Sequence, residues 1–256
     1  MSVGSPPPLG RRLLAELVGT GLLVAVVVGS GVAASRLSPG DVGLQLLCNA
    51  LATAFGLTVL ILLLGPVSGA HLNPVVSAAD WWLGRRRRDG LAGRDLPGYV
   101  AAQVAGGVLG ALLANAMFDV PHGLAGTDRA APGLWLSEVV ATAGLVALIL
   151  GLARSGRGAL AAPAVGAYIG AAYFWTASTS FANPAVTVGR VFSDTFAGIA
   201  PGSVPGFVAA QVAGGVAGLV LVRLLYPDVA RAAGALVVPR ADQEDPLAMP
   251  ETGAAR

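Results

Sequence analysis

The sequence predicts an all-α membrane protein in which six transmembrane helices and two re-entrant half-helices form an inverted repeat. Three observations predict this fold. Hydrophobic residues make up 55 % of the chain and charged residues only 12 %. Six apolar segments are each long enough to cross a bilayer, which takes about 20 residues. Two shorter segments, each opening with Asn-Pro, stand at matching places in a duplicated sequence.

The composition of the 256-residue chain excludes several classes of function. A soluble domain carries about 25 % charged residues, roughly twice the share found in this chain. The net charge of +2 comes without a basic patch large enough for nucleic acid. His71 and His122 are the only histidines and fall in different loops, and no nucleophile elbow, phosphate loop or metal-ligand pattern is present in the sequence. We therefore expect no enzyme activity, no cofactor and no metal.

The apolar segments divide the chain into a membrane domain and two tails. Arg11-Arg12 and the apolar run after them resemble the start of a signal peptide. The apolar run is longer than the ~7–15 residues of a signal-peptide core, so we expect it to remain in the protein as the first transmembrane span. The polar C-terminal tail is expected to be disordered. The spans are expected at 13–34, 42–64, 96–118, 134–152, 160–177 and 204–225, within a domain at 11–226 flanked by tails at 1–10 and 227–256.

The arginines predict the orientation of the spans. If six spans alternate, most arginines fall on one side, and only Arg36, Arg129 and Arg190 fall on the other. Cytoplasmic loops carry the excess of basic residues. We therefore expect a multi-pass protein of the inner membrane with both termini in the cytoplasm. The arginines on the expected cytoplasmic side are Arg11, Arg12, Arg85 to Arg88, Arg94, Arg154, Arg157, Arg231 and Arg240.

An internal repeat accounts for the pattern of long and short segments. The octapeptide Ala-Ala-Gln-Val-Ala-Gly-Gly-Val occurs at 101–108 and again at 209–216, at similar distances after the two Asn-Pro pairs. Repeat one covers 11–119 and repeat two covers 133–226, each with three spans and one short helix. Three is odd, so the second copy is inverted relative to the first. Inverted repeats place the functional site at their interface, near the bilayer midplane.

Small residues in the octapeptides predict close helix packing. Gly106 and Gly110 form a small-xxx-small pair, and so do Gly214 and Gly218. Such pairs allow membrane helices to approach closely. We expect these four glycines to lie at helix contacts.

The two Asn-Pro pairs predict a pore. Asn is a favoured N-cap and Pro fits the first helical position, so Asn73-Pro74 and Asn183-Pro184 each start a short helix at its buried end. Irregular backbone at membrane depth is tolerated only inside protein or along a water-filled cavity. Inversion brings the two positive helix ends together, which repels cations, while the side-chain amides can donate to an uncharged hydroxylated solute.

At these residues the sequence resembles the aquaporin, or major intrinsic protein, family. The motifs are Ser-Gly-Ala-His-Leu-Asn-Pro-Val at 68–75 and Phe-Ala-Asn-Pro-Ala-Val at 181–186. The resemblance covers about residues 11–226 and implies six spans, two half-helices and a homotetramer with one pore per subunit. It also implies a central constriction at Asn73, Asn183, Pro74, Pro184, Val75 and Ala185.

The resemblance implies roles for three further residues. Glu16 and Glu138 match the family's buried glutamates, which brace the re-entrant loops; an intramembrane acid is otherwise a candidate for function. His71 matches the histidine before the first motif, and it either touches the cytoplasmic vestibule or ties the loop down.

Departures from the family pattern predict an unusual selectivity filter. Val186 stands where the family places Arg, and Arg190 lies one helical turn further on, about 6 Å along the axis. The filter histidine is also missing, so we expect a wider and less polar mouth. Ser180 belongs to the predicted filter; span five contributes Ala171, with Tyr173 nearby, and span two contributes Phe55 or Thr53.

The segments 176–187 and 194–199 resemble a bacterial, aquaglyceroporin-like branch of the family linked to arsenic resistance. The resemblance implies a passive channel for water, glycerol-like polyols and undissociated arsenite, antimonite or methylated arsenicals. Two alternatives are a strictly water-selective channel and a coupled secondary transporter that uses Glu16 or Glu138 as its titratable group. A membrane scaffold without transport has no supporting feature in the sequence.

Overall fold

The computed structural model describes residues 7–85 and 90–226, and over these residues it is all-helical, without strands. Six of its helices are long and apolar enough to cross a membrane, which confirms the predicted fold class. The predicted tails at 1–10 and 227–256 fall largely or wholly outside the described residues. The six long helices are α1 (Leu9–Leu37), α2 (Val42–Ser68), α4 (Leu96–Met117), α5 (Pro132–Arg154), α6 (Ala161–Trp175) and α8 (Val204–Leu225).

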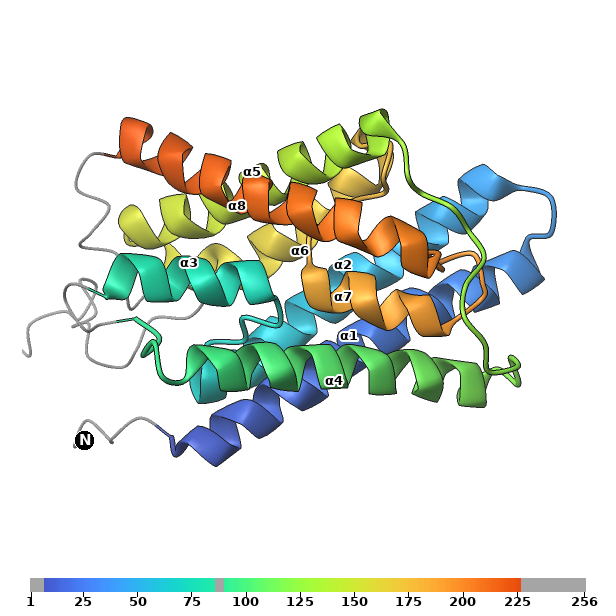
Figure 1. Cartoon of the computed structure of the whole chain (residues 1–256), viewed down its shortest axis with the longest axis horizontal. Helices are drawn as coiled ribbons and strands as arrows, with labels where there is room; N and C mark the ends of the chain where they lie inside the picture. Colours follow the sequence, from blue (N-terminus) through green and yellow to red (C-terminus); the bar gives the residue numbers. More distant parts are fainter. Residues whose placement is uncertain (1–6, 86–89, 227–256) are drawn as a thin grey trace, which may run out of the picture.

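Two short helices lie among the long ones. They are α3 (Pro74–Gly84) and α7 (Pro184–Gly189), and α7 continues into the 3₁₀ turn η2 (Arg190–Phe192). Figure 1 shows α3 and α7 pointing in opposite directions, with their first residues toward the middle of the molecule. Two further 3₁₀ turns, η1 (Gly158–Leu160) and η3 (Pro201–Ser203), precede α6 and α8.

The two repeats have matching contacts. Within repeat one, α1 packs along α4, and within repeat two α5 packs along α8 (Figure 1). These are the most extensive helix contacts in the described chain. Between the repeats, α2 packs on α6.

Glycines allow these helix pairs to approach closely. A methyl group added to Gly106 on α4 would overlap the backbone carbonyl of Leu17 on α1. One turn later, a methyl group on Gly110 would overlap the carbonyl of Gly21. The small residues therefore bring backbone against backbone, the contact expected of small-xxx-small pairs. The equivalent contacts between α8 and α5 join Gly214 to Val139 and Gly218 to Ala143.

The second glycine of each octapeptide faces the other repeat. Gly107 on α4 lies against the carbonyl of Ala185 and against Gly189, both on α7. Gly215 on α8 lies against the side chain of Val75 on α3. The third span of each repeat therefore supports the half-helix of the other, which fixes the two half-helices relative to each other.

Candidate functional site

Asn73 and Asn183 cap the two half-helices. The side-chain oxygen of Asn73 accepts a hydrogen bond of 3.0 Å from the Val75 N–H, and that of Asn183 accepts one of 2.9 Å from the Ala185 N–H. Each Pro occupies the first helical position, where a missing N–H costs nothing. Both caps have extended backbone and bonded side chains, so their amide nitrogens are held in fixed positions.

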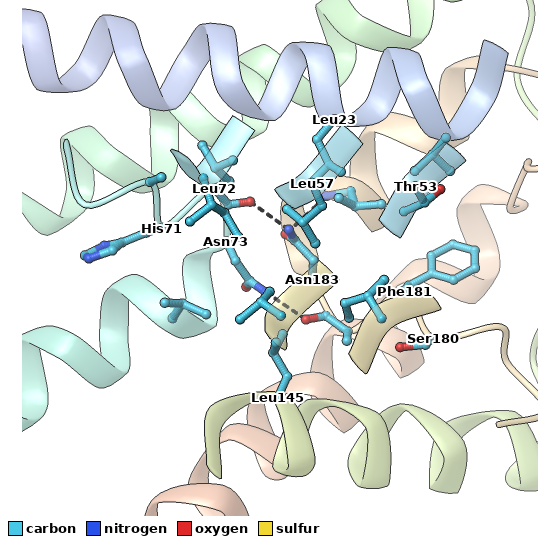
Figure 2. Close-up of a pocket in the computed structure, with 18 of the residues that line it drawn as sticks. Leu23, Thr53, Leu57, His71, Leu72, Asn73, Leu145, Ser180, Phe181 and Asn183 are labelled. Atoms are coloured by element: carbon cyan, nitrogen blue, oxygen red, sulfur yellow. Dashed lines mark hydrogen bonds between the residues drawn. The ribbon is translucent and has the colours of Figure 1, made fainter. Parts of the chain in front are cut away.

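The amide nitrogens of the two asparagines join the two re-entrant loops. Asn73 Nδ2 donates to the Ala182 carbonyl at 2.8 Å, and Asn183 Nδ2 donates to the Leu72 carbonyl at 2.7 Å, as Figure 2 shows. A carboxamide nitrogen carries two hydrogens. One hydrogen of each amide is therefore used to hold the two re-entrant loops together.

Left-handed backbone turns these two carbonyls toward the opposite repeat. Leu72 has φ 48° and Ala182 has φ 47°, and each directly precedes a capping asparagine. A non-glycine residue in this region costs on the order of 1–3 kcal/mol and persists only where its surroundings hold it. The hydrogen bonds on both sides of each residue supply that support.

Glu16 holds the first re-entrant loop in place by accepting hydrogen bonds from it. Its carboxylate accepts hydrogen bonds from the hydroxyl of Ser68 at 2.7 Å and from the N–H groups of His71 and Leu72 at 3.0 and 2.7 Å. The Gln103 amide adds a further bond of 2.7 Å. The carboxylate of Glu16 is fully buried, and these four hydrogen bonds offset the free-energy cost of removing its charge from water.

Glu138 makes the equivalent contacts in repeat two. It accepts from the N–H groups of Phe181 and Ala182 at 2.9 and 2.8 Å and from the Gln211 amide at 2.7 Å. Gln211 also donates to the hydroxyl of Thr187 on α7 at 2.8 Å. The two glutamines occupy the same place in both copies of the octapeptide, a signal from which their role could have been predicted.

A cavity passes the asparagine pair. Figure 2 shows His71 on one side of the pair and Thr53, Ser180 and Phe181 on the other. We call these the α3-side end and the α7-side end. The wall between them is mostly apolar and includes Leu23, Leu57, Ile61, Val76, Leu145, Ile149, Val165 and Ile169.

Two predicted filter residues do not line this cavity. The side chain of Phe55 is 68 % exposed on the outer face of α2, so of the two residues left open for span two it is Thr53 that faces the cavity; Ala171 is exposed on α6 and is corrected to the nearby Tyr173. Thr53 and Tyr173 line the cavity instead, with their hydroxyl oxygens 3.1 Å apart. Positions two apart on a helix point about 200° away from each other, so an offset of two residues exchanges the inner face for the outer.

The other three predicted filter residues lie at the α7-side end of the cavity. Val186, Ser180 and Arg190 all line it. Arg190 is 3 % exposed, its guanidinium carbon lies 3.4 Å from the centroid of the Phe181 ring, and its Nε donates to the Ala197 carbonyl. The displaced arginine therefore reaches the cavity from one turn beyond Val186.

Four of the six residues predicted for the central constriction do not line the cavity. Pro74, Val75, Pro184 and Ala185 are not among the residues that line the cavity, so these predictions are corrected. Val75 contacts α8, and the Ala185 carbonyl contacts α4. The second residue after each asparagine therefore packs against the third span of the other repeat.

His71 faces the cavity and contacts the first half-helix, while its place in a cytoplasmic vestibule stays a prediction. It lines the α3-side end of the cavity, and its Nδ1 lies 3.1 Å from the Ser77 hydroxyl on α3. Its Nε2 is 3.6 Å from the carboxylate of Asp80. The ring is thus tied to the first half-helix while it faces the cavity. Within residues 7–85 and 90–226, no group of His, Cys, Asp and Glu side chains could hold a metal ion.

Comparisons with known proteins agree with this geometry. The family model described as major intrinsic protein matches residues 5–182. The aquaglyceroporin AqpS of Rhizobium meliloti is 51 % identical over 85 % of this chain and 91 % of its own, and the glycerol uptake facilitator protein of Pseudomonas aeruginosa is 31 % identical over 78 % and 80 %. The X-ray structure of the aquaglyceroporin from Plasmodium falciparum superposes with a TM-score of 0.61 at 21 % identity, covering 88 % of this chain and all of the other, which is a likeness of fold.

Proposed function

Since the chain belongs to the major intrinsic protein family, whose members are passive channels and not enzymes, we propose that its pore passes uncharged solutes wider than water and excludes ions. The relatives support a membrane channel for small solutes of the water and glycerol type. Which of these solutes pass through the pore is our proposal. Glycerol-like polyols and undissociated arsenite, antimonite or methylated arsenicals are the candidates.

The observation that carries the proposal is Val186 on the wall of the cavity. A valine offers no charge and no hydrogen bond at the position three residues after Asn183. The polar groups that remain near it are the paired hydroxyls of Thr53 and Tyr173 and the more distant Arg190. Arsenite is a neutral trihydroxide near pH 7, so an apolar wall with a few hydroxyl and amide donors suits it, as it suits glycerol.

Exclusion of ions follows from the half-helices. Their N-terminal ends meet at the asparagine pair, and each helix end carries roughly half a positive charge. A cation must leave its hydration shell there, among N–H donors and apolar side chains that offer it few oxygens. A neutral solute meets no such barrier, because the asparagine amides replace its lost hydrogen bonds with water.

The assembly and orientation are also proposals. We place the chain in the inner membrane as a homotetramer, with both termini in the cytoplasm. The orientation rests on the arginines, since Arg36 and Arg129 are among the few at the α7-side end. The large apolar side chains exposed on α2 and α8 suit a surface that faces lipid or neighbouring subunits.

A coupled transporter is disfavoured by the position of its candidate acids. Glu16 and Glu138 are fully buried, are occupied by hydrogen bonds from the re-entrant loops, and do not line the cavity. A proton-coupled transporter needs a titratable group in the path of the solute. Accumulation of glycerol against its gradient, driven by pH, would reverse this conclusion.

The test is solute flux into proteoliposomes that contain the purified chain. We expect glycerol and arsenite to enter at rates well above those of protein-free vesicles. In the Val186→Arg variant we expect glycerol entry to fall about tenfold, equal to about 1.4 kcal/mol, while water flow changes less. Val186→Ile serves as the control, because it keeps the wall of the cavity apolar. Rapid water flow without glycerol or arsenite flow in the wild type would refute the wide-pore proposal.

A further inference from the structure

Two arginines lie over one aromatic ring, that of Phe181, which lines the α7-side end of the cavity together with Arg190. The guanidinium carbon of Arg190 lies 3.4 Å from the centroid of the Phe181 ring, and that of Arg129 lies 5.2 Å from it. Arg129 belongs to the loop between α4 and α5, and Arg190 belongs to η2. Each is anchored through Nε to one of two neighbouring carbonyls, Arg190 to Ala197 and Arg129 to Gly198.

Neither arginine has a carboxylate partner within residues 7–85 and 90–226. The adjacent Asp128 is engaged elsewhere: it accepts hydrogen bonds from the Ala130 N–H and the Ser203 hydroxyl, which hold its pKa below the usual value. Burial lowers the pKa of Arg129, an effect that the charge of Glu138 partly opposes. That carboxylate is already bonded to the second re-entrant loop.

The arrangement therefore leaves two positive charges close together, partly or fully removed from water, without a paired anion. Burial of a charge in a low-dielectric environment costs free energy unless the charge is paired and hydrogen-bonded. The guanidinium of Arg190 lines the cavity, and the hydrogen-bond contacts of the described chain occupy only its Nε, so its remaining N–H groups are free for a ligand. The Ser180 hydroxyl lines the same end, is 3 % exposed, and has no hydrogen-bond partner within the described residues.

We propose that Arg129, Arg190 and Ser180 form a binding site for a small, singly charged oxyanion, and that the bound anion blocks neutral solutes from the pore. A carboxylate is the favoured chemical class, because the planar fork of a guanidinium matches two carboxylate oxygens. The anion does not pass further. Beyond this end the wall is formed by side chains such as Leu57, Leu145 and Ile149, which cannot replace its hydration.

Binding is tested with formate on the purified full chain in detergent. We expect formate to raise the thermal unfolding temperature in a saturable way, and chloride at equal ionic strength to raise it less. Arg190→Gln and Arg129→Gln should each raise the half-saturating formate concentration about tenfold or more, since each removes a charge-assisted contact. Arg36→Gln is the matched control: Arg36 also lies over a phenylalanine at the same end of the molecule, but that ring belongs to Phe118 and not to Phe181 of the proposed site.

Blocking is tested by glycerol entry into proteoliposomes with formate on both sides; this part rests on the proposed function. Formate should slow entry in the wild type and in Arg36→Gln, and not in Arg190→Gln. Binding without slower entry would overturn the blocking role. If the wild type passes no glycerol, the proposed function fails, while the unfolding measurement still decides whether the anion site exists.

Two results would overturn the site itself. One is equal stabilisation by formate in the wild type and in both arginine variants, and the other is an equal effect of chloride. If Arg190→Gln does not fold, Arg190→Lys keeps the charge without the planar fork, and it should bind formate more weakly than the wild type. An unchanged affinity in Arg190→Lys and Arg129→Gln would count against the proposal.

Discussion

At the scale of single residues, the two buried glutamates carry the geometry of the pore. Glu16 binds the N–H of Leu72, whose carbonyl binds Asn183, and Glu138 binds the N–H of Ala182, whose carbonyl binds Asn73. Each chain of contacts runs from an acid in one repeat to the asparagine of the other. The position of each asparagine amide therefore depends on a glutamate that does not itself line the cavity.

Replacement of Glu16 by glutamine tests this dependence. The new amide group offers hydrogens where the N–H of His71 and the N–H of Leu72 need an acceptor, so at least one buried donor loses its partner. We expect a loss of about 2–4 kcal/mol in stability, together with slower glycerol flux. Thermal unfolding in detergent is the measurement, and Asp119→Asn, at an exposed acid, is the control. Equal unfolding temperatures for Glu16→Gln and the wild type would show that the loop does not need the acid.

The sequence alone located the asparagines, the glutamates, Val186 and the displaced Arg190, because each stands within or next to a recognisable motif. It left Phe55 and Thr53 open in span two and placed Ala171 before the nearby Tyr173 in span five, because no motif fixes the phase of these helices. A shift of two residues exchanges Phe55 for Thr53 and Ala171 for Tyr173, and only packing decides which face of the helix points inward. Residues in long apolar spans are therefore the hardest part of this site to assign from sequence.

At the scale of helices, the repeated octapeptide makes three different contacts, one through its Gln and one through each of its two Gly residues. Its Gln binds the glutamate of its own repeat, its first Gly meets the first span of that repeat, and its second Gly meets the half-helix of the other repeat. The sequence predicted the close packing of Gly106 and Gly214. It could not predict the contacts of Gly107 and Gly215, because those join segments far apart in the chain.

Substitution of Gly110 by alanine tests the closest of these helix contacts. The added methyl group would overlap the Gly21 carbonyl, so α1 and α4 must move apart. Overpacking of this kind costs about 1–3 kcal/mol. We expect Gly110→Ala to unfold at a lower temperature in detergent than the wild type. Gly133→Ala on α5 is the matched control, because an added methyl group there meets nothing within 4 Å. A similar small change in the unfolding temperature of both variants would mean that α1 and α4 can move apart at little cost in free energy.

At the scale of the whole molecule, the inverted repeat explains why one short motif must occur twice. A single half-helix would leave its capping asparagine without the opposite carbonyl that receives its amide hydrogen. With two inverted copies, each loop supplies the acceptor that the other needs, and the cavity lies where they meet (Figure 2). The odd number of spans in each repeat was enough to predict this inversion from the sequence. The support of each half-helix by the third span of the other repeat was not predictable in that way.

The orientation in the membrane gives the last prediction. The loop between α4 and α5 contains His122, which is exposed, and the loop between α5 and η1 contains Ser155, which is exposed at the opposite end of α5. Since arginines are concentrated at the second of these ends, we expect His122 outside the cell and Ser155 inside. With Cys48, the single cysteine, replaced by serine, a membrane-impermeant maleimide should label His122→Cys in intact cells and Ser155→Cys only after permeabilisation. Equal labelling of both variants in permeabilised cells is the control for reactivity. The opposite order of labelling would show that the chain has the inverse orientation in the membrane. The proposed anion site at Arg129 and Arg190 would then face the cytoplasm.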